Sequence, residues 1–128
     1  MHLAAMTRRL LLLATSLATT LALQAAPAQA GSAQAAFGNT VLTIDPDGRS
    51  RKIWLKPDGT WTGLSRRGLS LAGTWSEKGS QVCIKQTKPR LPGSMCNQLP
   101  AQVGASLSAK DPTGKTVQIK LVQGRVTK

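Results

Sequence analysis

Clusters of turn-forming residues punctuate this chain and constrain its fold more than any other feature of the sequence. They are Pro46-Asp47-Gly48, Pro57-Asp58-Gly59 and Asp111-Pro112-Thr113-Gly114. In such clusters proline presets φ and glycine takes the left-handed conformation that closes the turn. The runs between them alternate apolar and polar residues, as in T-V-Q-I-K-L at residues 116–121, and no stretch after Gly31 has a sustained helical period. The sequence therefore predicts an antiparallel all-β protein.

The spacing of the turns also predicts which side chains share a face. Loops of three residues at 57–59 and 66–68 keep neighbouring strands in step, and the first places Leu55 opposite Trp61. Because successive side chains on a strand point to opposite faces, one parity then runs through three strands. The predicted inward-facing residues are Ile53, Leu55, Trp61, Leu69, Leu71 and Trp75.

The first hairpin departs from this scheme. A three-residue loop at residues 46–48 would turn Leu42 and Ile44 away from the predicted interior. We therefore expect a longer loop or a β-bulge between the strands at residues 39–45 and 50–56.

The clearest single hairpin lies at residues 69–87. With residues 78–79 as its loop, Trp75 lies opposite Val82. Cys83 then points to the other face of the sheet, where it can reach a second cysteine.

The remaining strands follow in the last third of the chain. A short sixth strand is expected at residues 95–99, after the two-proline loop at 88–94, and a last hairpin joins residues 102–110 to 115–122. About eight short strands joined by tight turns predict a small up-and-down barrel, with a two-sheet sandwich as the alternative.

The first thirty residues have the pattern of a secretory signal peptide. Arg8-Arg9 precede an apolar run, and Ala28-Gln29-Ala30 forms a small-x-small cleavage site. We expect cleavage after Ala30, a flexible lead-in at residues 31–38 and a single β domain at residues 39–128. The apolar run is shorter than the about 20 residues of a spanning helix, so a retained membrane anchor is the alternative and the mature chain has no predicted transmembrane segment. The predicted location is periplasmic or secreted, and the arginine pair leaves a twin-arginine export route open.

Two cysteines, Cys83 and Cys96, occur in the chain. In an exported protein a lone pair is most simply a disulfide, and closing so short a loop stabilises a fold by about 3 kcal/mol in the chain-entropy model. Two separate buried thiols are the alternative. A redox-active pair is disfavoured, because catalytic pairs are usually C-x-x-C.

The predicted mature chain is strongly basic and poor in catalytic groups. Without the signal peptide its formal charge is +10, which predicts attraction to anionic surfaces. The only histidine, His2, lies in the signal peptide, so neither a histidine-ligated zinc site nor a Ser-His-Asp triad is expected. A Ser-Lys dyad remains the one catalytic alternative, and we expect a non-enzymatic protein without cofactor or metal. The five acids all lie at predicted turns: Asp45, Asp47, Asp58, Glu77 and Asp111.

Two groups of residues are candidates for binding. On the outward face of the second and third strands basic residues flank a tryptophan, which could stack on a sugar ring or anchor a protein partner. The alternative is that a neighbouring loop or the N-terminal arm covers this tryptophan. The second group lies on and beside the disulfide-clamped loop, which would lose little entropy on binding but could equally be a solvated connection. The candidates are Lys52, Trp54, Lys56 and Arg66 in the first group and Lys85, Lys88 and Arg90 in the second.

The segment Leu71-Ala72-Gly73-Thr74-Trp75, followed by Cys83, resembles the strand pattern of small exported bacterial β-barrel proteins. The nearest such family is that of the bacterial metalloprotease inhibitors, and the likeness covers residues 69–96. That family inserts an N-terminal segment into the protease cleft. The corresponding segment here would be residues 31–37, which do not match residue for residue, so no functional residues carry over.

Together these features predict a non-enzymatic binding module of the bacterial cell envelope, with inhibitor-like action on a protein partner as one form of it. The alternative is an electrostatic binder of anionic envelope polymers or lipids, and an enzyme of unknown class is the least favoured reading. Nucleic acid is disfavoured as a partner, because export removes most of it from reach and the chain has one Phe and no Tyr for base stacking.

Overall fold

The computed structural model describes residues 33–128, which form eight antiparallel strands and one short 3₁₀ helix. The predicted signal peptide and its cleavage after Ala30 lie outside the described residues. The elements are η1 (Ala33–Ala36), β1 (Thr40–Ile44), β2 (Ser50–Leu55), β3 (Thr60–Leu64), β4 (Ser70–Lys78), β5 (Gln81–Lys88), β6 (Met95–Asn97), β7 (Ser106–Lys110) and β8 (Thr116–Val122).

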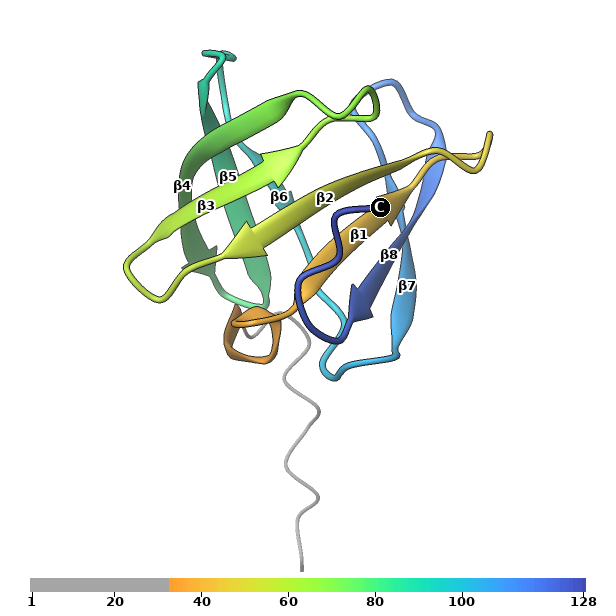
Figure 1. The fold of residues 1–128 in the computed structure, drawn as a ribbon. Coiled ribbons are helices and arrows are strands. Elements are labelled where there is room, and N and C mark those ends of the chain that lie inside the picture. Colours follow the sequence, from red (N-terminus) through yellow and green to blue (C-terminus); the bar gives the residue numbers. More distant parts are fainter. Residues whose placement is uncertain (1–32) are drawn as a thin grey trace, which may run out of the picture.

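The strands form one sheet in the order β6-β5-β4-β3-β2-β1-β8-β7. This is the order of an up-and-down barrel whose seam lies between the two edge strands, β6 and β7. Figure 1 shows the sheet curling around a common interior, so the domain is a nearly closed barrel. The predicted all-β barrel is therefore confirmed over the sandwich alternative.

The glycine-bearing turns hold neighbouring strands in the predicted register. The Lys56 N–H donates to the Thr60 carbonyl at 2.9 Å, and the Asp111 N–H donates to the Lys115 carbonyl at the same distance. Leu55 lies opposite Trp61, as predicted. The turn chemistry therefore fixes the pairing at both the second and the last hairpin.

The first hairpin uses the same three-residue turn, and the prediction of a longer loop or bulge there is wrong. The Asp45 N–H donates to the Arg49 carbonyl at 2.8 Å, and Val41 pairs with Ile53. Val41 thus fills the interior, whereas Leu42 and Ile44 face outward and are half-buried. The outer side of β1 tolerates apolar residues because the C-terminal segment turns back across it (Figure 1).

The hairpin between β4 and β5 forms with a register two residues away from the predicted one. Trp75 lies opposite Ile84 rather than Val82, and the loop is residues 79–80. A shift of two residues leaves every side chain on its predicted face, because side chains alternate with a period of two. The predicted interior therefore survives the error in register.

A tightly packed core fills part of the barrel. Trp61 is only 2% exposed, and its indole fits because glycines lie beside it: a Cβ on Gly73 would come within 2.6 Å of the indole nitrogen. Leu69 was predicted to belong to this core and is instead 62% exposed, because it precedes β4 and lies beyond the end of the sheet. The core cluster consists of Ala33, Ala36, Val41, Leu55, Trp61, Val82, Leu99, Ile119 and Leu121.

The predicted flexible lead-in is part of this core for most of its described length. Ala33 and Ala36 are each 1% exposed, and the Ala33 N–H donates to Glu77 Oε1 at 2.7 Å. The Phe37 ring packs 5.7 Å from that of Trp75. Small residues suggest flexibility when only composition is considered, but here their size lets η1 fit closely against the end of the barrel (Figure 1).

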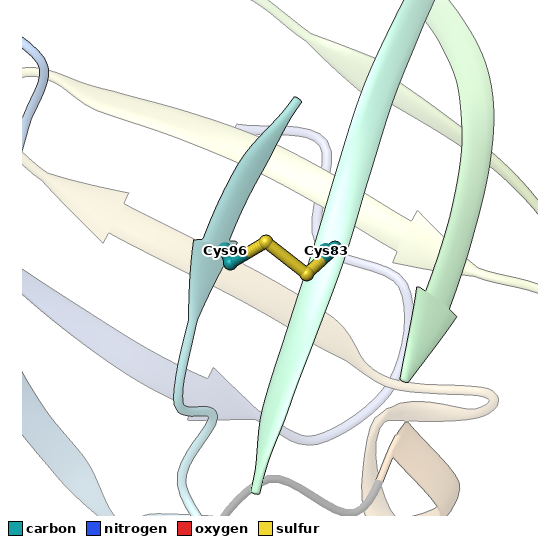
Figure 2. The surroundings of a disulfide bond; sticks show 2 residues. All are labelled: Cys83 and Cys96. Carbon is teal, nitrogen blue, oxygen red and sulfur yellow. A yellow bond between two sulfur atoms is a disulfide. The ribbon is translucent and has the colours of Figure 1, made fainter. Parts of the chain in front are cut away.

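The predicted disulfide between Cys83 and Cys96 is confirmed. The two residues lie directly opposite one another on β5 and β6, and Figure 2 shows the bond bridging these adjacent strands. It therefore ties the edge strand β6, which has three residues, to the body of the sheet. Among residues 33–128 no helix has the length and apolar character needed to cross a membrane.

Candidate functional site: the open end of the barrel

The two ends of the barrel carry different connections. We call the closed end the one formed by η1, the β2–β3 and β4–β5 turns and the connection from β6 to β7. The opposite end, which we call the open end, carries the other four connections, since alternate turns of an antiparallel meander lie at the same end. These are the segments 45–49, 65–69, 89–94 and 111–115.

Charge is distributed unequally between these ends. Within the described residues the connections that define the closed end are balanced, with Lys56 and Lys78 against Asp58 and Glu77. The C-terminal segment, which leaves the sheet at this end, adds Arg125. In its four connections and within two residues of them, the open end has eight basic side chains against the three carboxylates of Asp45, Asp47 and Asp111. The basic residues are Arg49, Arg51, Arg66, Arg67, Lys88, Arg90, Lys110 and Lys115. This end is therefore the more attractive one for an anion.

A buried carboxylate organises the open end. Asp45 is 8% exposed, and its two oxygens accept from Arg51 Nη2 and Arg66 Nε, each at 3.1 Å. Asp45 and Arg51 both face inward, because their parity is that of the inward-facing Val41 and Ile53. The three-residue turn thus places an ion pair at the mouth of the barrel.

Asp47 extends this network on the outside of the mouth. Its carboxylate accepts from the Arg49 backbone N–H at 3.0 Å and from Arg66 Nη2. The Arg49 backbone hydrogen bond, reinforced by the charges of Arg66 and Arg49, holds the pKa of Asp47 below its usual range. Asp47 is therefore a permanent anion at neutral pH, and it orients Arg66.

Below the mouth, the barrel interior contains a cavity of about 180 Å³. Its wall is largely apolar and includes Ile53, Leu71, Ile84, Met95, Val117 and Ile119. Polar groups line it as well, among them Arg51, Lys110 and Asp111 at the open end. A separate cleft of about 430 Å³ lies between the turns, and Arg51 and Asp111 line both spaces. These two residues therefore mark the passage between cavity and cleft.

Arg51 is incompletely bonded in this position. Its Nη2 pairs with Asp45, but its Nε is buried and has no hydrogen-bond partner among residues 33–128. A buried donor without an acceptor costs about 1–3 kcal/mol, so such groups call for an explanation. The side chain as a whole is 32% exposed.

Asp111 has a structural role in its own turn. Its Oδ1 accepts from Thr113 Oγ1 at 2.6 Å and from the backbone N–H groups of Thr113 and Lys115 at 2.9 Å. The Thr113 hydroxyl is the main cause that lowers the pKa of this carboxyl. Like Asp47, it is ionised at neutral pH. The geometry of the open end thus favours recognition of charge rather than proton transfer.

Trp54, the central predicted binding residue, is covered. It is 6% exposed, and its indole N–H donates to Thr40 Oγ1 at 2.9 Å. The guanidinium carbon of Arg125 lies 3.9 Å from the centroid of its ring, a cation–π contact. The alternative of a covered tryptophan therefore holds, although the C-terminal segment provides the cover rather than a loop or the N-terminal arm.

The other predicted binding residues fall into separate groups. Lys56 and Lys88 line a shallow hollow of about 480 Å³ on the outer face, beside Trp54 and Arg125. Lys52 lies on the same outer face of β2 and is half-buried, whereas Lys85 is exposed on β5. Arg66 and Arg90 belong to the open end. The structure therefore does not gather the predicted candidates into one site.

Sequence reasoning missed the residue that lies at the mouth of the cavity. Arg51 is two positions before Ile53, so the parity that placed Ile53 inside also places Arg51 inside. The alternation that predicts an inward Ile53 is therefore a signal from which Arg51 could have been found. Comparison of the chain with protein-family models, curated proteins and solved structures found no match.

Proposed function

We propose that this protein is an exported, non-enzymatic binding module that takes anionic ligands at the open end of its barrel. The observation that carries the proposal is the contrast in charge: the excess of basic residues over acidic ones is larger at this end than at the closed end. Such a concentration of one sign attracts oppositely charged partners and speeds their encounter.

The carboxylates of the open end support binding rather than catalysis. An acid or base catalyst at neutral pH needs a pKa near 7, whereas the pKa values of Asp47 and Asp111 are shifted down. Asp45 is held between two guanidinium groups. Among residues 33–128 no group of three His, Cys, Asp or Glu side chains is placed to hold a metal ion.

The proposal is tested by measuring the salt concentration that elutes the protein from immobilised dextran sulfate, a generic polyanion. The open-end variant is Arg67→Gln with Arg90→Gln, two exposed residues on different loops. The matched control is Lys56→Gln with Lys78→Gln at the closed end, which removes the same net charge. We expect the wild type and the control to elute at similar salt, and the open-end variant at clearly lower salt.

Two outcomes would contradict the proposal. Equal shifts for the two double variants would mean that the polyanion responds to net charge and not to the open end. Elution of the wild type at low salt, on the order of 50 mM, would mean that the clustered charges confer no useful affinity.

A further inference from the structure

We propose that the barrel interior binds a small monocarboxylate, whose apolar body fills the cavity and whose carboxylate meets Arg51 at the open end. This inference rests on the proposed function, because Arg51 belongs to the open end. It goes further by naming the ligand class and by placing most of the ligand inside the barrel.

The size of the cavity limits the ligand. A barrel of about eight strands is just wide enough to be filled by side chains or to hold one small ligand. Here a space of about 180 Å³ remains between the open end and the core residues of the closed end, among them Leu55 and Trp61, which form part of its wall. Cavities of about 150 Å³ accommodate a benzene molecule. The ligand is therefore of the size of one aromatic ring or a short acyl chain.

The wall of the cavity selects an apolar body. Ile53, Leu71 and Ile84 line it and are only half-buried, although all three lie on the inner face of the sheet. Exposed apolar surface inside a barrel gains free energy when a ligand covers it. The wall thus has the composition of a small-molecule site, with few polar groups at one end.

Arg51 selects the charge and the shape of the head group. A guanidinium offers parallel N–H groups that match the two oxygens of a carboxylate. In Arg51 the Nε–H is buried and without a partner among the described residues, while the pair with Asp45 fixes the side chain in place. This Nε–H is buried and out of reach of a ligand, whereas the side chain as a whole is 32% exposed, so a carboxylate at the mouth would accept from the other N–H groups of the guanidinium.

Other charges at the mouth are compatible with such an anion. The Asp111 carboxylate lies on the lining, but its Oδ1 is directed to Thr113 and Lys115 in its own turn. The charge of the nearby Lys115 offsets part of the charge of Asp111. Arg66 pairs with both Asp45 and Asp47, so the network of Arg51, Arg66 and these two aspartates is formally neutral. The attraction for a ligand carboxylate therefore comes from the exposed part of the Arg51 guanidinium and from the other basic residues of the open end.

The inference is tested by titrating the wild-type protein with hexanoate, hexanol and acetate while recording NMR spectra of its methyl groups. Hexanoate has both required parts, hexanol lacks the charge and acetate lacks the apolar body. We expect saturable binding of hexanoate that is more than about tenfold tighter than that of either control. The methyl signals of Ile53 and Ile119 should shift as it binds.

Two substitutions locate the site. Ile84→Trp puts a large side chain into the cavity and should abolish binding of hexanoate, whereas Gln118→Trp on the outer face of β8 is the matched control and should leave it unchanged. Arg51→Gln keeps the cavity and should reduce the preference of hexanoate over hexanol to less than about threefold. If Ile84→Trp does not fold, the wild-type titrations and Arg51→Gln still decide the question.

The results separate this inference from the proposed function. Hexanoate that binds no tighter than acetate, or no tighter than hexanol, overturns the inference. Ile84→Trp should still elute from dextran sulfate at wild-type salt, because a polyanion does not enter the barrel. If the wild-type protein binds hexanoate but does not bind dextran sulfate, only the proposed function is contradicted.

Discussion

The two ends of this barrel use the same turn chemistry but differ in what lies beneath the turns. At the closed end Trp61, Leu55 and the alanines of η1 pack into a dense core. The open end holds the pair of Asp45 and Arg51, and a cavity lies between this pair and the closed-end core, with Leu55 and Trp61 in its wall. The comparison teaches that close packing and polar recognition can be assigned to opposite ends of one small sheet. It also predicts that the closed end contributes most of the stability.

The largest expected effect is the loss of the Trp61 indole at the closed end. Trp61→Ala removes a side chain that is 2% exposed and whose N–H donates to the carbonyls of Thr74 and Lys85. Such a truncation costs about 3–5 kcal/mol of the free energy of unfolding. Leu71→Ala, on the wall of the cavity, is the matched change toward the open end and should cost less than about 2 kcal/mol, because Leu71 is half-buried.

Urea-induced unfolding followed by far-ultraviolet circular dichroism measures both costs. Equal losses of unfolding free energy in the two variants would contradict the contrast between the ends, since both ends would then contribute alike to stability. A loss near zero for Leu71→Ala would strengthen the contrast, since the wall of the cavity would then contribute almost nothing to stability.

Much of the fold could be predicted because the turns specify it locally. Proline and glycine at fixed spacings determine the loop length, and loop length determines which residues lie opposite one another, as for Leu55 and Trp61. The error in register between β4 and β5 did not change the predicted interior, because side chains on a strand alternate with a period of two. A shift of two residues therefore leaves Trp75 and Ile84 on the same face. The first hairpin failed because hydrophobicity was trusted over turn geometry, and Leu42 looked like a core residue.

The candidate site was harder to predict, because it depends on contacts distant in the sequence. Trp54 is covered by Arg125, which is distant from it in the sequence, and no local sequence pattern predicts that contact. The ion pair of Asp45 and Arg66 likewise joins two different turns. Whether a core leaves a cavity depends on the summed volumes of side chains from many strands. The alternation of apolar and polar residues predicts which side chains face inward but not whether together they fill the interior.

A smaller effect is expected from removing the charge of Asp45 at the open end. Asp45→Asn leaves Arg51 and Arg66 around a neutral amide and should lower the free energy of unfolding by about 1–2 kcal/mol, because both arginines are partly exposed and screened. The same change should strengthen binding to dextran sulfate, because it removes a negative charge from the open end. Asp58→Asn, at the closed end, is the control for charge.

Elution from dextran sulfate and urea unfolding, measured on the same two variants, decide this prediction. Stability and polyanion binding should move in opposite directions for Asp45→Asn, and binding should stay nearly constant for Asp58→Asn. Later elution of both variants to the same extent would mean that the position of the charge is irrelevant, contrary to the contrast between the ends.

The smallest expected effect concerns a feature that the two ends share. Asp58 accepts from Thr60 Oγ1 at 2.6 Å and from its backbone N–H at 3.0 Å, much as Asp111 does with Thr113 at the other end. In both turns the threonine hydroxyl is the main cause that lowers the pKa of the carboxyl below its ordinary value of 3.8. A lowered pKa in the folded state means that folding favours the ionised form. The stabilisation is therefore fully present above pH 3.8 and is lost as the pH falls through the lower, folded-state pKa.

Thermal unfolding at pH 6 and pH 2.5 of the wild type, Asp58→Asn and Asp111→Asn measures this contribution separately at each end. We expect the wild type to lose more of its melting temperature on acidification than either variant, because an asparagine has no proton to gain. The two variants should lose similar amounts, since the turns have the same bonds although they lie above different interiors. A clearly larger role for Asp111 would show that its charge acts beyond its own turn, on the arginines of the open end, and the ends would then differ in their turns as well as in their interiors.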